Sequence, residues 1–178
     1  MNTVKVLDRQ FEIFLSSEKI QDRVKVLADD ISKVYADKTP FFIGILNGSF
    51  MFASDLLKNL NFPCQVSFMK LASYSGTQSL GVVNNLVGLK ENIEGRHVII
   101  IEDIIDTGLT ISHLLEEIQA KKPASISIAT FLLKPEALKK DVKADYVGFE
   151  VPVKFLIGYG LDYDGYGRNL KHIYSEVE

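Results

Sequence analysis

The 178-residue sequence lacks several features that would each point to a particular class of protein. Its one cysteine, Cys64, cannot form an internal disulfide, which fits a reducing compartment. We expect this thiol to be a small buried apolar side chain. The histidines His97, His113 and His172 are scattered without the spacing of metal ligands, so they predict no metal site.

Long apolar runs and a large excess of one charge are also missing. The apolar runs fall well short of the roughly 18 residues that a membrane-spanning helix needs. Residues Met1–Gln10 lack the apolar core and the cleavage site of a signal peptide. A net charge of −3 argues against a general nucleic-acid or membrane-surface binder, yet it permits a small cationic pocket for phosphates. We therefore expect a cytoplasmic protein with no nucleic-acid or membrane partner.

The composition is that of an ordinary soluble globular protein, with 47% hydrophobic and 24% charged residues. The length predicts a single domain over residues 1–178 with a sizeable core. No internal repeat, low-complexity stretch or interdomain linker divides the sequence.

Hydrophobic periodicity predicts strands that alternate with helices. This alternation predicts an α/β fold with a mainly parallel central sheet and helices on both faces. Ligands of such sheets bind beyond the carboxyl ends of the strands. Helices are expected at 20–34, 53–60 and 111–118, strands at 41–46, 66–71, 85–90, 98–102, 125–133, 146–150 and 155–158, and a mobile polar loop at 73–82.

The most informative segment is Val98–Thr110. A buried strand meets two adjacent carboxylates, Glu102 and Asp103, and a short Asp-Thr-Gly loop then precedes a helix. The backbone N–H groups, the hydroxyls and the positive end of the helix dipole together suit a phosphate. Because Asp106 adds a third carboxylate, the segment suggests a phosphorylated sugar whose hydroxyls need acceptors, a bound metal ion or a proton transfer.

This segment resembles the phosphoribosyl-pyrophosphate (PRPP) motif of type I phosphoribosyltransferases. Further segments resemble the 6-oxopurine branch of that family, the hypoxanthine-guanine phosphoribosyltransferases, and the resemblance covers nearly the whole chain in order. It implies the type I phosphoribosyltransferase fold, with a small hood built from N- and C-terminal segments. The supporting segments are Gly44–Phe50, Ser73-Tyr74, Phe131–Lys134, Asp145–Pro152, Lys154–Tyr163 and Arg168.

The resemblance implies transfer of ribose 5-phosphate from PRPP to hypoxanthine or guanine, which yields IMP or GMP and pyrophosphate with Mg²⁺ as cofactor. Asp106 would be the general acid/base beside N7 of the base. Glu102 and Asp103 would accept hydrogen bonds from the ribose hydroxyls. The implied metal-binding residues are Glu102, Asp103 and Asp162, and the implied 5′-phosphate cradle is Asp106, Thr107, Gly108, Leu109 and Thr110.

The implied purine site contains four residues. Lys134 would donate a hydrogen bond to the 6-oxo group and so favour 6-oxopurines over adenine. Phe155 would stack on the purine face, and backbone groups of Leu156 and Asp162 would contact its edge.

The implied pyrophosphate site consists of Asn47, Gly48 and Arg168, and Ser73 and Tyr74 would close over the site as a lid that excludes water. Two positions depart from the family's pattern. Asn47 stands where a lysine is usual, and Leu109 stands where a basic residue is frequent. Each change removes a positive charge near a phosphate, so we expect weaker binding of PRPP or pyrophosphate.

Simpler explanations exist for several of these residues taken alone. Glu102 and Asp103 fit a solvated rim, Lys134 fits the surface, Phe155 fits the core, and Arg168 fits a surface ion pair. The PRPP motif and the surrounding segments favour the functional interpretation.

Two alternative functions stay open. A PRPP- or nucleotide-binding regulator of the same fold would lack catalysis, and it is disfavoured by the net charge of −3 and by the lack of an added nucleic-acid-binding segment. The same reaction with xanthine as the preferred base is not distinguished by any side-chain pattern. The family commonly forms dimers and tetramers, so we expect a homo-oligomer.

Overall fold

The computed structural model describes residues 3–72 and 84–177. Its centre is a six-stranded sheet with the strand order β5-β4-β3-β6-β7-β8. All neighbouring strands pair in parallel except β5, which runs antiparallel to β4. The predicted mainly parallel sheet is therefore confirmed. Its strands are β3 (Phe41–Leu46), β4 (Gln65–Ala72), β5 (Asn84–Val87), β6 (His97–Ile105), β7 (Ser125–Leu133) and β8 (Tyr146–Glu150).

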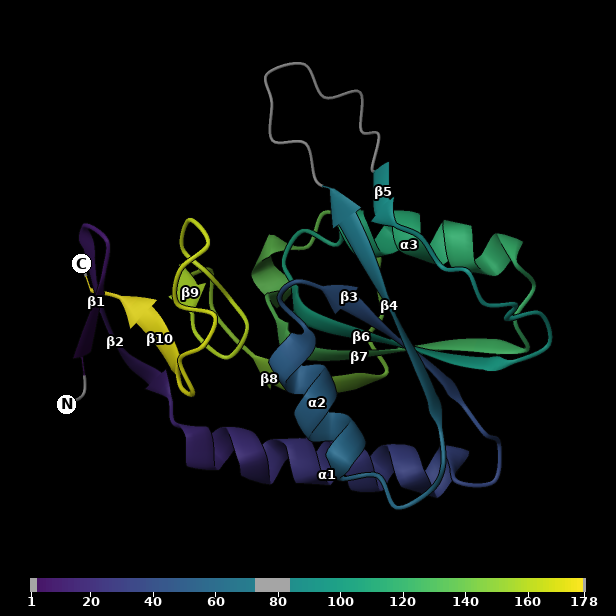
Figure 1. The fold of residues 1–178 in the computed structure, drawn as a ribbon. Coiled ribbons are helices and arrows are strands. Elements are labelled where there is room, and N and C mark those ends of the chain that lie inside the picture. The colour runs from purple at the N-terminus through teal and green to yellow at the C-terminus, as the bar shows by residue number, and fades with distance from the viewer. Residues whose placement is uncertain (1–2, 73–83, 178) are drawn as a thin grey trace.

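Helices cover both faces of this sheet, as Figure 1 shows. Helices α1 (Ser17–Tyr35) and α2 (Phe50–Lys58) pack on one face, and α3 (Leu109–Ala120) packs on the other. Along β6, Ile99 contributes to the core under α1 and α2, whereas its neighbour Ile100 contributes to the core under α3. This alternation follows from the two-residue period of a strand.

Helix α1 begins at Ser17, three residues before the range 20–34 expected from the sequence. The side chain of Ser16 accepts a hydrogen bond from the backbone N–H of Lys19, at 3.4 Å, and so caps the helix. Arg23 of α1 donates to the backbone carbonyls of Gly148 and Val147, at 2.8 and 2.6 Å. The helix is thereby tied to the edge strand β8.

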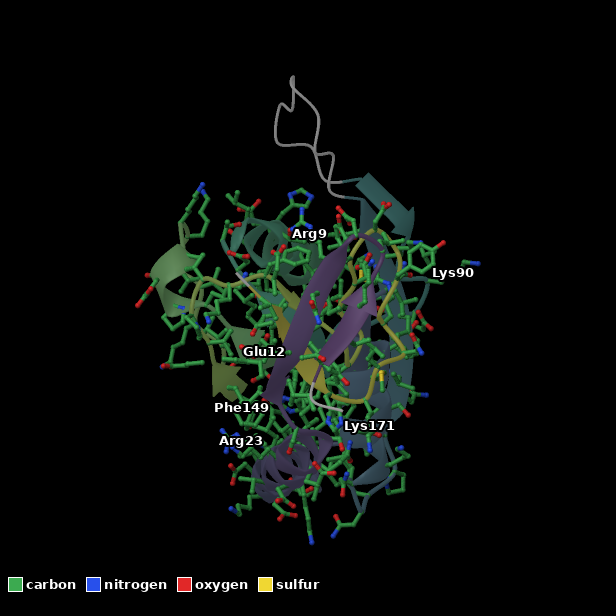
Figure 2. All side chains as sticks on the ribbon, turned by 90° about the vertical axis from the view of Figure 1, so that its left-hand side faces the viewer. Arg9, Glu12, Arg23, Lys90, Phe149 and Lys171 are labelled. Atoms are coloured by element: carbon green, nitrogen blue, oxygen red, sulfur yellow. The ribbon has the colours of Figure 1, made fainter. Side chains whose placement is uncertain are left out.

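A second, antiparallel sheet forms the hood and faces the viewer in Figure 2. Its core contains Phe11, Ile157 and Tyr174. The hood as a whole was expected only from the family resemblance, because the sequence pattern predicts just one of its strands, at 155–158. The hood strands, in spatial order, are β1 (Thr3–Val6), β2 (Arg9–Leu15), β10 (Ile173–Glu176) and β9 (Leu156–Ile157).

Several element boundaries differ from the sequence-based expectation. Strand β6 continues three residues past Glu102 to Ile105, because its pairing with β7 extends to Leu133. The strand expected at 85–90 ends at Val87, the one expected at 155–158 is reduced to β9, and the helix expected at 53–60 is α2. A short 3₁₀ turn, η1 (Pro135–Ala137), follows β7. The loop expected at 73–82 lies outside the described residues.

Two further expectations concern Cys64 and membrane-spanning helices. Cys64 is half-buried at the margin of the core, not fully buried as expected, and burial raises the pKa of its thiol. Among the residues that the structure describes, no helix is long and apolar enough to cross a membrane.

Candidate active site

The carboxylates Glu102 and Asp103 lie within strand β6, near its carboxyl end. The Oε2 atom of Glu102 is buried and has no hydrogen-bond partner among the described residues. Burial, and next the neighbouring Asp103, raise the pKa of Glu102 well above its usual range. Burial also raises the pKa of Asp103, although a hydrogen bond from the backbone N–H of Ile104, at 2.9 Å, opposes the shift. A buried acceptor without a donor is what a ligand hydroxyl or a metal ion would satisfy.

The loop after β6 leads into α3 through Gly108. This glycine has φ +78°, and a Cβ built there would lie 3.3 Å from Val142, so the turn suits glycine in both conformation and space. The loop is held from the far side, because Lys139 donates its backbone N–H to the carbonyl of Thr107, at 2.9 Å. The first N–H groups of α3 have no partner within the helix and point toward the loop.

A cavity of about 120 Å³ opens at this loop. Backbone N–H groups and hydroxyls at a helix N-terminus form a favourable environment for a phosphate. Leu109 does not line the cavity, and half of its surface is exposed. The lining residues are Glu102, Ile104, Ile105, Asp106, Thr107, Gly108, Thr110 and Ile111.

Asp106 and Lys134 form an ion pair that the sequence did not predict. The Lys134 Nζ lies 2.8 Å from Oδ2 of Asp106, and Lys134 is almost fully buried. The two residues are 28 positions apart, and only the pairing of β6 with β7 brings them together. Both were expected at the purine, so the contact is consistent with one binding position for the base.

The second candidate loop, residues 47–49, joins β3 to α2. The Leu46-Asn47 peptide bond is cis. Gly48 is packed against Asp103 so closely that a Cβ at Gly48 would lie 1.5 Å from the Asp103 Oδ2 atom. Glycine is therefore required at this position by space, which the sequence alone did not reveal.

Beside the 47–49 loop lies a second cavity, of about 270 Å³. It brings together residues that the sequence assigned to pyrophosphate and to metal, from both the sheet and the hood. The lining residues are Ile45, Leu46, Asn47, Gly48, Leu71, Glu102, Asp103, Ile104, Thr110, Asp162 and Arg168. Because Glu102, Ile104 and Thr110 line both cavities, the two form one continuous site.

The hood contributes a second ion pair to this site. Arg168 Nη2 lies 2.5 Å from Oδ1 of Asp162, and Arg168 Nη1 donates to the carbonyl of Gly160, at 2.8 Å. The other Asp162 carboxylate oxygen accepts the backbone N–H of Gly165, at 2.7 Å. Arg168 is thus held at the cavity by partners on its own segment.

Of the expected purine-binding residues in the hood, Phe155 and Leu156 lie outside the two cavities, whereas Asp162 lines the second one. Phe155 is 43% exposed, and its ring packs edge-on against Tyr163 with centroids 5.7 Å apart. The guanidinium of Arg9, labelled in Figure 2, lies 5.6 Å from the Phe155 ring centroid. Leu156 is buried in β9, so only its backbone is available to a ligand. The lid residues Ser73 and Tyr74 lie outside the described residues.

The donor set fits Mg²⁺ only in part. Carboxylate oxygens of Glu102, Asp103 and Asp162 line one cavity and are the hard ligands that Mg²⁺ prefers. Within the described part of the chain, however, no group of three or more His, Cys, Asp or Glu residues is arranged to hold a metal ion. This suits an ion that takes its other ligands from substrate phosphates and water.

Fold and site together define a class of protein. The family model for the phosphoribosyl transferase domain matches residues 11–164. The chain is 45% identical over 163 residues to the hypoxanthine-guanine phosphoribosyltransferase of Bacillus subtilis, covering 91% of each chain. It is 42% identical to the hypoxanthine-guanine-xanthine phosphoribosyltransferase of Tritrichomonas foetus, covering 96% of this chain and 93% of that protein.

A solved structure of a hypoxanthine-guanine phosphoribosyltransferase from Bacillus anthracis superposes with a TM-score of 0.89 at 38% identity. The superposition covers 93% of this chain and 98% of the other. The chain belongs to the hypoxanthine-guanine phosphoribosyltransferase family.

Proposed function

We propose that the protein transfers the 5-phosphoribosyl group of PRPP to hypoxanthine or guanine and releases pyrophosphate, as a purine salvage enzyme. The observation that supports this best is the continuous site, which joins a phosphate cradle at α3 to a second cavity with Arg168 and three carboxylates. Such a site accommodates a sugar that bears a phosphate at one end and a pyrophosphate at the other.

In this proposal the 5′-phosphate binds the loop from Asp106 to Thr110, which includes Thr107, Gly108 and Leu109. The ribose hydroxyls donate to Glu102 and Asp103, which supplies the missing partner of the buried Glu102 oxygen. The pyrophosphate binds at Asn47, Gly48 and Arg168 in the second cavity.

The base would lie between the Asp106–Lys134 pair and the hood. Lys134 donates to the 6-oxo group, and Asp106 exchanges a proton at N7 of the purine. Phe155 stacks on the ring, and the backbone of Leu156 and Asp162 contacts its edge. Ser73 and Tyr74 would close the site against water. Catalysis then depends on orienting the base and stabilising the departing polyanion more than on a nucleophile.

Mg²⁺ is proposed as the cofactor, held by Asp162 and by Glu102 or Asp103. When bound, it neutralises charge on the pyrophosphate leaving group. The proposed setting is the cytoplasm, and the proposed assembly is a homo-oligomer, either a dimer or a tetramer. A relative whose name includes xanthine supports xanthine as a second possible substrate.

The test is product formation by the purified protein with PRPP and Mg²⁺, with hypoxanthine, guanine, xanthine and adenine offered separately. We expect nucleotide and pyrophosphate from the 6-oxopurines and no product from adenine. Binding of PRPP without product from any base would contradict catalysis and favour the non-catalytic regulator.

A further inference from the structure

Tyr159 is a buried tyrosine in the hood segment, residues 158–172 between β9 and β10. Its hydroxyl contacts helix α2, which packs on the central sheet. Tyr159 is 2% exposed, and its ring packs on Phe131 with centroids 4.8 Å apart. Its hydroxyl donates to Oδ2 of Asp55 in α2, at 2.8 Å. Neither Tyr159 nor Asp55 lines either of the two cavities, so a role for this pair must act through neighbouring residues.

The backbone at Tyr159 directs the side chain into the core and turns the following residue toward the site. Tyr159 has φ +47°, a left-handed conformation that non-glycine residues rarely adopt. The next residue, Gly160, has φ +103°, and a Cβ there would lie 1.9 Å from the carbonyl oxygen of Gly48. The hood segment and the 47–49 loop therefore touch through their backbones directly beside the second cavity.

The other partner, Asp55, belongs to the helix that continues the 47–49 loop. Ala53 donates its backbone N–H to the carbonyl of Ser49, at 2.7 Å, and Phe50 donates to that of Asn47, at 3.4 Å. Because these bonds fix the loop to the first turn of α2, a contact at Asp55 is transmitted to Gly48 through one rigid element.

The charge state of the pair suits a lasting hydrogen bond. Burial disfavours the Asp55 carboxylate, but donors from Lys58, Gln21 and Tyr159 outweigh it and hold the Asp55 pKa below its usual range. Burial and the Asp55 charge raise the pKa of Tyr159, so its hydroxyl stays protonated and donates. Hydrogen bonds to a charged acceptor are among the stronger ones in proteins.

We propose that the Tyr159–Asp55 hydrogen bond sets the spacing between the 47–49 loop and the Arg168–Asp162 pair, and that Tyr159 is a positioning residue for pyrophosphate. The carbonyl of Gly160, next to Tyr159, accepts from Arg168, so a shift of Tyr159 moves Arg168 relative to Gly48. The inference rests on the proposed transferase function and adds to it a residue that lies outside the cavities.

The test is Tyr159→Phe, which retains the ring packing on Phe131 and removes only the hydroxyl. We expect the KM for PRPP, and for pyrophosphate in the reverse reaction, to rise about tenfold, the effect of one charge-assisted hydrogen bond. The KM for hypoxanthine should change less than about twofold, because the spacing at the Asp106–Lys134 pair is unaffected.

Lys58→Gln is the matched control. Lys58 pairs with the other Asp55 carboxylate oxygen, Oδ1, at 2.7 Å, and it belongs to α2 itself, so this ion pair does not join the helix to the hood. The control should leave both KM values unchanged. If Tyr159→Phe fails to fold, Asp55→Asn provides a second test that leaves the buried ring in place. It should raise the KM for PRPP and for pyrophosphate but not the KM for hypoxanthine.

The outcomes distinguish a failure of the proposed transferase function from a failure of the positioning role of Tyr159. A wild-type protein without transferase activity would overturn the proposed function. An active wild type with a Tyr159→Phe variant whose KM for pyrophosphate is unchanged would overturn the positioning role alone. Equal rises in the KM of PRPP and of hypoxanthine, with a lowered Tm, would reduce Tyr159 to a structural residue and would also contradict the inference.

Discussion

The Nζ atom of Lys134 and the Oδ2 atom of Asp106 lie 2.8 Å apart, and the lysine is buried whereas the aspartate side chain is 48% exposed. A buried ammonium with one carboxylate partner has further donors to offer, and the exposed side of Asp106 has acceptors to offer. A purine with an oxygen at position 6 and a nitrogen at position 7 presents the complementary groups on one edge.

Asp106→Asn should lower kcat by about 10²- to 10⁴-fold, the usual contribution of general acid/base catalysis. The amide still accepts a hydrogen bond from Lys134, and the backbone of the phosphate cradle is unchanged, so the Kd for PRPP should stay within about threefold of wild type. Single-turnover kinetics and PRPP titration measure the two quantities. Asp141→Asn, an exposed carboxylate on the following loop, is the control. Full turnover in the Asp106 variant would rule out the acid/base assignment.

Lys134→Gln should reduce the preference for hypoxanthine over adenine, because the ammonium donates only, whereas an amide also accepts from an amino group. We expect kcat/KM for hypoxanthine to fall about tenfold or more, the cost of losing a charged hydrogen bond. Initial rates with both bases provide the ratio. Lys139→Gln, exposed on the neighbouring turn, should leave the ratio unchanged. If Lys134→Gln also left the ratio of hypoxanthine to adenine rates unchanged, the 6-oxo group of the purine would not bind at Lys134.

Gly48→Ala tests the close packing of the 47–49 loop against β6. The added methyl group would lie 1.5 Å from the Asp103 carboxylate, so the loop or Asp103 must move. Overpacking of this kind costs about 1–3 kcal/mol, and we expect a KM for pyrophosphate at least about tenfold higher. Gly88→Ala is the matched control, since a Cβ there meets nothing within 4 Å. Identical kinetics of the two variants would show that Gly48 is not constrained.

Glu102→Gln should stabilise the protein at neutral pH. Burial, and then the charge of Asp103, raise the Glu102 pKa in the folded state above its unfolded value. The folded state therefore binds the proton more tightly, and this contribution to stability is complete below the ordinary carboxyl pKa and is lost as pH rises through the folded value.

Urea unfolding at pH 4 and pH 7 checks this prediction. Glutamine imitates the protonated acid, so the variant should gain free energy of unfolding at pH 7 and almost none at pH 4, while its activity falls. Glu12→Gln, at an exposed position of β2, should show no such difference (Figure 2). Equal stability of Glu102→Gln and wild type at both pH values would contradict a raised pKa.

The sequence predicted the central sheet and its helices because each of those elements has a local signal. Strand β6 begins with a continuous run of buried apolar residues, and α1 has an apolar stripe at helical spacing. The hood strands β1 and β10 are short, at four residues each, and β10 pairs with β2, which is distant in sequence. They were therefore placed only through the family resemblance.

The site was predicted in its residues but not in its contacts. The motif named Asp106 and Lys134, yet their ion pair depends on the register between β6 and β7. The contact of Gly48 with Asp103 depends on two strand ends meeting at one edge of the sheet. Tyr159 packs on Phe131, but its hydrogen bond to Asp55 spans 104 positions and leaves no local signal in the sequence.

The exposed positions Asn47 and Leu109 allow the two phosphate sites to be tested separately. Asn47 lines the second cavity, where Arg168 faces three carboxylates, so the cavity is short of positive charge for a pyrophosphate. Asn47→Lys should lower the KM for PRPP and for pyrophosphate by about fivefold, the effect of about 1 kcal/mol from one added ion pair at a partly exposed site.

Leu109→Lys adds the same charge at the first turn of α3, beside the 5′-phosphate cradle and away from the second cavity. It should lower the KM for PRPP and for IMP but leave that for pyrophosphate unchanged, because pyrophosphate does not occupy the cradle. Reverse-reaction kinetics with IMP and pyrophosphate varied independently distinguish the two variants. Both gains should shrink as salt rises, since screening weakens exposed charges. If Leu109→Lys improved pyrophosphate binding as much as Asn47→Lys, the assignment of the two cavities to separate phosphates would be wrong.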